Sequence, residues 1–157
     1  MPVSSCPLDD WLPHRPPMRL IDEIVSVDLA SETLVAAFTA RRDWCANWVA
    51  IELMAQAAAA LAGAADRAEG WKGPARPGFL LGTRKLTLDI PAFTVGARYT
   101  VRAHSLFRDA ESASFDCAVL DGARTVATAT LNAYRPPDVA AFLAGQRLAA
   151  PDGTGKI

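Results

Sequence analysis

One long, proline-free segment dominates the sequence. Residues 48–67 consist mostly of alanine and other strong helix formers, whereas the chain around them is rich in β-branched and aromatic residues. About twenty helical residues form a rod of roughly 30 Å, which is the length of a small domain. A single helix cannot cover a flat sheet of six strands, so the sheet is expected to curl around this rod.

The segments on either side of the helix are expected to be strands. Residues 18–27 and 33–39 are predicted to pair as a hairpin before the helix. The strands expected after it are residues 79–89, 97–107, 114–120 and 125–134. Asp121 and Gly122 form a strong hairpin-turn signal between the last two strands. The sequence therefore predicts an α+β fold.

The outer segments complete a single expected domain over residues 1–157. Leu8–Leu12 has room for one helical turn before the following proline, and residues 139–148 are predicted to form a short terminal helix. The core is expected over about residues 11–135, with the C-terminal helix and tail at 137–157 and fraying over 151–157.

Composition excludes several classes of function. Of the 157 residues, 51% are hydrophobic, so the chain is not expected to be disordered. The 16 Lys and Arg residues are balanced by 17 Asp and Glu residues, so nucleic-acid binding is not expected. Cys6, Cys45 and Cys117 show neither a disulfide framework nor zinc-ligand spacing, and no metal site is predicted. No signal peptide is recognisable, and the alanine-rich segment is too weakly apolar for a membrane span. A soluble, cytoplasmic protein is expected.

Glu52 is the anomaly of the predicted helix. A carboxylate in a largely buried helix is costly unless it is paired, hydrogen-bonded or protonated, and Gln56 shares its helix face. Two interpretations stay open. Glu52 is either a capping carboxylate that the helix macrodipole stabilises near the N-terminus, or a catalytic group. Asn47 is predicted to be the N-cap. The small alanines of the helix would let the sheet approach closely.

Two motifs at compatible spacing carry a resemblance to a known family. Residues 12–22 resemble the Leu-Pro-His-Arg-x-Pro opening of the bacterial 3-hydroxyacyl-acyl-carrier-protein dehydratases, and residues 51–57 resemble the Glu-x-Met-Ala-Gln-Ala start of their central helix. Residues 78–82 are similar to the strand that follows. The run Trp-Val-x-Ile-Glu-x-Met-Ala-Gln is similar to the dehydratase-like proteins of aryl polyene synthesis. The resemblance implies the hot-dog fold, a curled sheet around one helix.

The resemblance implies that Glu52 is the catalytic carboxylate. In the family this carboxylate works with a histidine from the loop before the helix, across a dimer interface, but residues 41–47 contain no histidine. His14 is the candidate replacement base, with a loop anchor as the other interpretation. His104 is expected to face solvent, because it has the opposite parity to the apolar set of its strand, which includes Phe107. An acid and a base on either side of a substrate would lie roughly 5–8 Å apart.

The candidate substrate contacts are Asn47, Trp48, Gln56 and Gly82, with the thioester expected near the helix amides of residues 47–51. No cofactor is expected beyond the phosphopantetheine arm of an acyl carrier protein. Cys45 is a weak candidate nucleophile, since no histidine lies near it. Basic residues that could meet an acidic carrier protein are Arg15, Arg41, Arg42, Arg76, Arg84 and Lys85.

Three functions compete at this stage. The leading one is dehydration of 3-hydroxyacyl thioesters on acyl carrier protein, in fatty-acid, polyketide or aryl polyene synthesis. The second is a non-catalytic hot-dog subunit that binds a carrier protein or stabilises a partner, and the third is a hot-dog thioesterase. A homodimer or a heterodimer with another hot-dog subunit is expected, because an unpaired sheet edge needs a cover.

Overall fold

The computed structural model describes residues 8–148, and the side chains of residues 8–145. The chain forms α1 (Leu8–Trp11), β1 (Glu23–Asp28), β2 (Thr33–Thr39), the 3-10 turns η1 (Arg42–Trp44) and η2 (Asn47–Val49), and α2 (Ala50–Ala68). It continues with β3 (Phe79–Leu88), β4 (Arg98–Arg108), β5 (Ser112–Asp121), β6 (Arg124–Tyr134) and α3 (Val139–Leu148).

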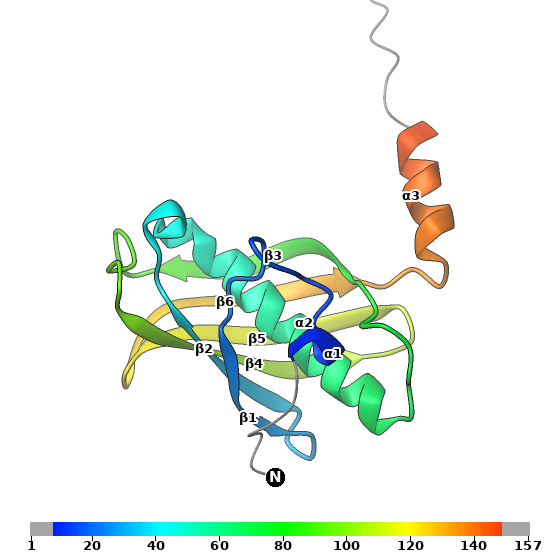
Figure 1. Cartoon of the computed structure of the whole chain (residues 1–157), viewed down its shortest axis with the longest axis horizontal. Coiled ribbons are helices and arrows are strands. Elements are labelled where there is room, and N and C mark those ends of the chain that lie inside the picture. The colour runs from blue at the N-terminus through cyan, green and yellow to red at the C-terminus, as the bar shows by residue number, and fades with distance from the viewer. Residues whose placement is uncertain (1–7, 149–157) are drawn as a thin grey trace, which may run out of the picture.

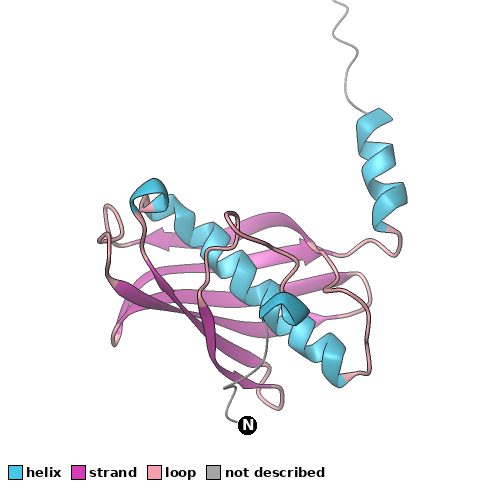
Figure 2. Ribbon diagram, viewed as in Figure 1, coloured by secondary structure: helices cyan, strands magenta, loops and turns pink. Residues whose placement is uncertain are grey.

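All six strands form one antiparallel sheet in the order β1-β2-β4-β5-β6-β3. The sheet curls, and α2 runs across its concave face (Figure 1). Figure 2 shows that α2 is the long helix against the sheet, whereas α3 stands at its side. This arrangement confirms the predicted α+β, hot-dog fold.

The core lies between α2 and the central strands. Leu53, Met54 and Ala57 of α2 are fully buried, and they belong to the same apolar cluster as Val101 of β4 and Val119 of β5. The segment Asn47–Ala68 is long and apolar enough to span a membrane by length and composition, yet 67% of its apolar 18-residue window is buried inside the protein. The segment is therefore the core helix of this fold.

Short α1 crosses α2 at a position where no side chain fits. A Cβ built on Gly63 would collide with the backbone carbonyl of Trp11. Glycine at this position therefore permits the close approach of the two helices, which holds the beginning of the described chain against the C-terminal half of α2.

Three local expectations are wrong. The first strand begins at Glu23 and not at residue 18, because the amides of Leu20 and Ile21 bond a side chain of α2 instead of a neighbouring strand. Asn47 is not the N-cap: α2 begins at Ala50, and the Asn47 amide donates to the Ile90 carbonyl at 3.0 Å. Phe107 is 53% exposed, because a bulge between Ser105 and Phe107 shifts the alternation of β4, so that this side chain points to solvent and not to the core.

Candidate functional site

Gln56 ties the N-terminal loop to the central helix. Its side chain is fully buried, and its Oε1 accepts the Leu20 amide at 2.8 Å and the Ile21 amide at 3.5 Å. Its Nε2 donates to the Met18 carbonyl and to Glu52 Oε1, both at 2.8 Å. A buried amide with all these partners satisfies the backbone of a loop that forms no strand. Gln56 therefore fixes where the loop passes over α2.

This loop brings His14 to Glu52 within one chain. His14 Nε2 lies 3.5 Å from Glu52 Oε1, and the two side chains are 32% and 44% exposed. Glu52 lies in the first turn of α2, where the helix dipole favours a negative charge. No arginine neutralises it among the described residues. The buried Nδ1 of His14 has no hydrogen-bond partner within residues 8–148, so the imidazole meets a polar group only at Nε2.

The geometry corrects the expected separation of acid and base. The measured 3.5 Å is shorter than the gap of roughly 5–8 Å that a substrate between them would need. His14 and Glu52 instead line the same cavity together.

The cavity beside this pair has a volume of about 230 Å³. The four alanines Ala55, Ala58, Ala59 and Ala62 form its helix wall. These small side chains, which were expected to let the sheet approach, leave room for the cavity. Its opposite wall is mostly aromatic and aliphatic and includes Phe79, Leu80, Phe115, Leu131 and Tyr134. Such an apolar slot next to an ionisable pair is typical of a small-molecule site.

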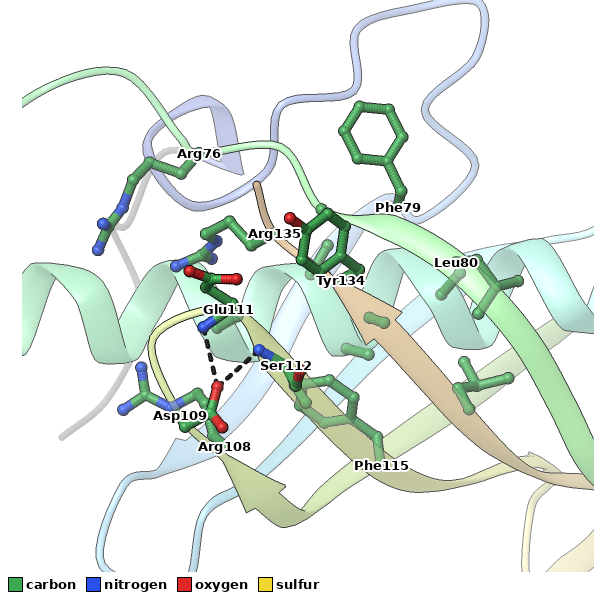
Figure 3. A pocket seen from close by; sticks show the side chains of 18 of the residues that line it. Arg76, Phe79, Leu80, Arg108, Asp109, Glu111, Ser112, Phe115, Tyr134 and Arg135 are labelled. Atoms are coloured by element: carbon green, nitrogen blue, oxygen red, sulfur yellow. Dashed lines mark hydrogen bonds between the residues drawn. The ribbon is translucent and has the colours of Figure 1, made fainter. Parts of the chain in front are cut away.

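The other end of the cavity is charged. Figure 3 shows Arg76, Arg108 and Arg135 gathered at this end with Asp109 and Glu111, away from Leu80. Behind them, Asp66 is only 2% exposed, and its carboxylate binds Arg76 at 2.8 Å and Arg135 at 3.0 Å. Arg76 also lies over the Trp71 ring at 4.7 Å. This network fastens the end of α2 to the loop before β3 and to the end of β6.

The turn between β4 and β5 carries its own hydrogen bonds at this end. Asp109 accepts the backbone amides of Glu111 at 2.8 Å and Ser112 at 2.7 Å, drawn as dashed lines in Figure 3. These bonds stabilise the charged form and hold the pKa of Asp109 below its usual range. Asp109 is therefore a turn-forming carboxylate.

Three predicted substrate contacts do not line this cavity. Asn47 faces the Ile90 carbonyl, Trp48 is 65% exposed, and Gly82 lies on β3 outside the cavity lining. Gln56 also stays behind the wall, where it holds Glu52 in place. The helix start differs from the expectation as well. The Val49 and Ala50 amides donate within the η2 turn, so they are not free to bind a thioester oxygen.

The predicted basic contacts have varied surroundings. Arg76 takes part in the Asp66 network, and Arg41 binds Asp22 at 2.8 Å. Arg15 donates to the Leu12 carbonyl at 2.6 Å. The remaining three, Arg42, Arg84 and Lys85, are exposed.

His104 is exposed on β4, as its parity predicts, and its Nδ1 lies 3.2 Å from Thr33 Oγ1. The Cys45 thiol lies 3.7 Å from the Arg42 carbonyl, and no hydrogen bond joins it to a histidine within residues 8–148. Burial raises the pKa of the Cys117 thiol to about 12, which keeps it protonated. Cys6 lies outside the described residues. Neither described cysteine therefore has the surroundings of a nucleophile.

Sequence reasoning missed most of the cavity wall. Phe115 and Leu131 are buried and face inward on neighbouring strands, a position that strand alternation could have indicated. Arg108 and Arg135 gave no such signal, because they reach the cavity only through the curl of the sheet.

The sequence signature of the ApeP-like family, described as ApeP dehydratase, matches residues 6–144. In the dehydratase heterocomplex ApeI:P from Xenorhabdus doucetiae, a chain 27% identical to this one aligns over 92% of this chain and 99% of that chain, with a TM-score of 0.80. No curated protein matches the sequence.

More distant structures share the fold alone. A hypothetical thioesterase from Streptococcus pneumoniae, determined with coenzyme A, is 12% identical, over 73% of this chain and 84% of that chain, with a TM-score of 0.54. The PaaI protein of Escherichia coli is 15% identical, over 72% and 82%, with a TM-score of 0.53. The match across residues 6–144 is what decides the family: this chain belongs to the ApeP-like dehydratases.

Proposed function

We propose that this protein eliminates water from 3-hydroxyacyl thioesters carried by an acyl carrier protein. The observation that carries the proposal is the pair of His14 Nε2 and Glu52 Oε1, 3.5 Å apart at the edge of an apolar cavity. Membership of a dehydratase family supports it.

The reaction needs a base for the α-proton and an acid for the departing hydroxyl. In the proposed step, neutral His14 Nε2 takes the α-proton while protonated Glu52 gives a proton to the 3-hydroxyl. The C–H and C–O bonds break, a C=C bond forms between the two carbons, and water leaves. His14 then holds the α-proton of the substrate, and Glu52, whose proton left with the water, is a carboxylate. Because the two groups are in near contact, the proton on His14 passes to Glu52 and resets the site.

Two features of the surroundings position the reacting groups. Gln56 donates to the same Glu52 oxygen that faces His14, so the carboxyl group has a fixed orientation. The alanine wall gives the acyl chain an apolar surface, and burying each CH₂ group contributes about 0.8 kcal/mol. The phosphopantetheine arm of the carrier protein would present the thioester, and no other cofactor is part of the proposal.

We propose a second hot-dog subunit as the partner, in a homodimer or a heterodimer. Strand β3 is an edge of the sheet, and Leu81 and Leu86 on it are 68% and 38% exposed. Exposed leucines on an edge strand favour pairing with another chain. The similar structure from Xenorhabdus doucetiae is a heterocomplex, which supports such pairing. A cytoplasmic location and a place in fatty-acid, polyketide or aryl polyene synthesis belong to the same proposal.

The test is the conversion of 3-hydroxyacyl-carrier-protein to the enoyl product, followed by mass spectrometry. Glu52→Gln and His14→Ala are each expected to lower kcat/KM by about 10²–10⁴, the usual contribution of a positioned acid or base. His104→Ala is the matched control, because that histidine is exposed and does not line the cavity. Its activity should equal that of the natural chain.

Other outcomes would assign a different function. Full activity in Glu52→Gln would remove that carboxylate from the mechanism, and full activity in His14→Ala would leave the imidazole as a loop anchor. Release of free thiol without an enoyl product would identify a thioesterase. Binding of the carrier protein with no turnover, alone or with a second hot-dog subunit, would identify the non-catalytic role, which the loop without histidine at residues 41–47 favours.

A further inference from the structure

His14 lies in a loop with few hydrogen bonds of its own. Residues 12–17 form neither helix nor strand, and three of them are prolines, which have no amide hydrogen to donate. The ring itself meets a polar group only through Nε2, since Nδ1 has no hydrogen-bond partner within residues 8–148. The position of the imidazole beside Glu52 therefore depends on what holds the backbone on either side of it.

Gln56 holds this loop only after the imidazole. The backbone groups that it bonds belong to Met18, Leu20 and Ile21, and all of them follow His14 in the chain. A turn over residues 16–18 lies between His14 and these bonds. Fixing the backbone of His14 itself therefore requires another anchor, on the N-terminal side of the turn.

Arg15 is that anchor. Its Nη1 donates to the Leu12 carbonyl at 2.6 Å and to the His14 carbonyl at 3.1 Å, and its Nη2 donates to the Asp9 carbonyl at 3.2 Å. No backbone amide bonds the Leu12 or the His14 carbonyl in the part of the chain that the structure describes. The guanidinium therefore takes the place of backbone partners and joins α1 to the residue that bears the imidazole.

These bonds use the shape of the guanidinium more than its charge. The three acceptors are uncharged carbonyls, whereas the carboxylate oxygen Oδ1 of Asp9 lies 3.8 Å from Arg15. Arg19 binds that oxygen at 2.6 Å and, within residues 8–148, its side chain bonds no loop carbonyl. A guanidinium presents five donors in a planar fork, but a lysine ammonium is a flexible point charge. Lysine at position 15 would keep the charge and lose the geometry.

Arg15 does not line the cavity. Its side chain is 52% exposed, and it is not part of the cavity wall that His14 and Glu52 share. Any effect of Arg15 on the reacting pair is therefore transmitted through the backbone of His14. In this respect it differs from Gln56, which bonds the Glu52 carboxylate directly.

We propose that Arg15 is a positioning residue for the pair of His14 and Glu52. By bonding the carbonyls of Leu12 and His14, it holds the imidazole where Nε2 reaches the carboxylate. The inference rests on the proposed function in one respect, which is that this pair performs the elimination. It gives Arg15 a role inside its own subunit, in place of the carrier-protein contact that the sequence suggested.

The kinetic test compares Arg15→Lys and Arg15→Met with the natural chain in the elimination assay. Each variant should lower kcat by about 10–100-fold, because a displacement of about 1 Å in a reacting group has an effect of this size. The KM should change by less than about threefold, since Arg15 is not in the cavity wall. Arg19→Met is the matched control, because Arg19 belongs to the same loop and bonds only the exposed Asp9 side chain. It should keep the natural kcat and KM.

A double variant separates positioning from a general loss of structure. If Arg15 acts through the imidazole, adding Arg15→Met to His14→Ala should lower kcat no further than His14→Ala alone. A structural defect elsewhere would instead lower it again. Circular dichroism of each variant checks the fold, and Arg15→Lys, which keeps the charge, decides the result if Arg15→Met does not fold.

Imidazole ¹⁵N–¹H spectra of the full-length chain give a measurement that needs no turnover. The chain contains two histidines, so the signals of His14 are distinguished from those of the exposed His104 by the variant His104→Ala. Glu52→Gln should shift the His14 signals and leave those of His104 in place. In the Arg15→Lys and Arg15→Met backgrounds the same substitution should shift them less than about half as far, because the ring has moved away from residue 52.

Several results would overturn the inference. Natural kcat in Arg15→Met would do so, and so would a further decrease of kcat in the double variant. Full activity in Arg15→Lys with loss in Arg15→Met would show that the charge matters, as a contact with an acidic carrier protein requires. If the natural chain forms no enoyl product, the proposed elimination fails, and the spectra alone decide the role of Arg15. An equal shift of the His14 signals in all backgrounds would then refute it.

Discussion

Replacing Gln56 by methionine tests the connection between the N-terminal loop and the central helix. Methionine keeps the length of the side chain and its apolar stem but removes both polar atoms. The buried backbone amides of Leu20 and Ile21 would then lose their acceptor. The Glu52 carboxylate would lose a hydrogen bond as well, but it is 44% exposed and water can replace that bond.

The magnitude follows from the two backbone groups. Each buried and unsatisfied donor or acceptor costs about 1–3 kcal/mol, so the variant should lose about 2–6 kcal/mol in its free energy of unfolding. For a chain of this size, 1 kcal/mol lowers the Tm by about 2–4 °C. A loss near 3 kcal/mol therefore predicts a decrease in Tm of about 6–12 °C. The proposed elimination should also slow, because the loop that carries His14 is no longer held.

Thermal unfolding followed by circular dichroism, with urea unfolding for the free energy, measures this effect. Glu52→Gln is the control, since its amide oxygen still accepts the bond from Gln56 and its position is partly exposed. That variant should stay within about 1 kcal/mol of the natural chain. A Tm for Gln56→Met within about 2 °C of the natural value would refute the assigned role of this side chain.

Two further perturbations test other parts of the molecule. Leu81→Lys, on the exposed β3 edge, should yield a smaller assembly in light scattering. The control Leu106→Lys, at a residue that is 53% exposed on the interior strand β4, should leave the assembly unchanged. An unchanged assembly in Leu81→Lys would exclude this edge as the interface. The protonated Cys117 thiol is favoured in the folded chain, so stability should decline as pH rises from 9.0, the ordinary pKa of a thiol, toward about 12. Cys117→Ala should flatten that decline in alkaline urea titrations, and an unaltered slope would contradict the assignment.

The sequence by itself determined the local elements and one pair of the site. The helix period places Glu52 and Gln56 on one face, and the observed bond between them at 2.8 Å confirms that prediction. The turn at Asp121–Gly122 joins β5 to β6 as predicted, with Gly122 at a φ of 57°. Helix spacing and turn chemistry depend on residues close in sequence, so the sequence records them directly.

Only the tertiary structure decided how these elements meet. Strand β3 pairs with β6 and not with β4, the next strand along the chain, and no local pattern distinguishes the two pairings. His14 reaches Glu52 because a buried amide four residues further along the helix bonds the loop between them. The charged end of the cavity arises where the curled sheet brings Arg108 and Arg135 to the end of α2. Contacts of this kind depend on the curvature of the whole sheet, a property that no single segment of the sequence contains.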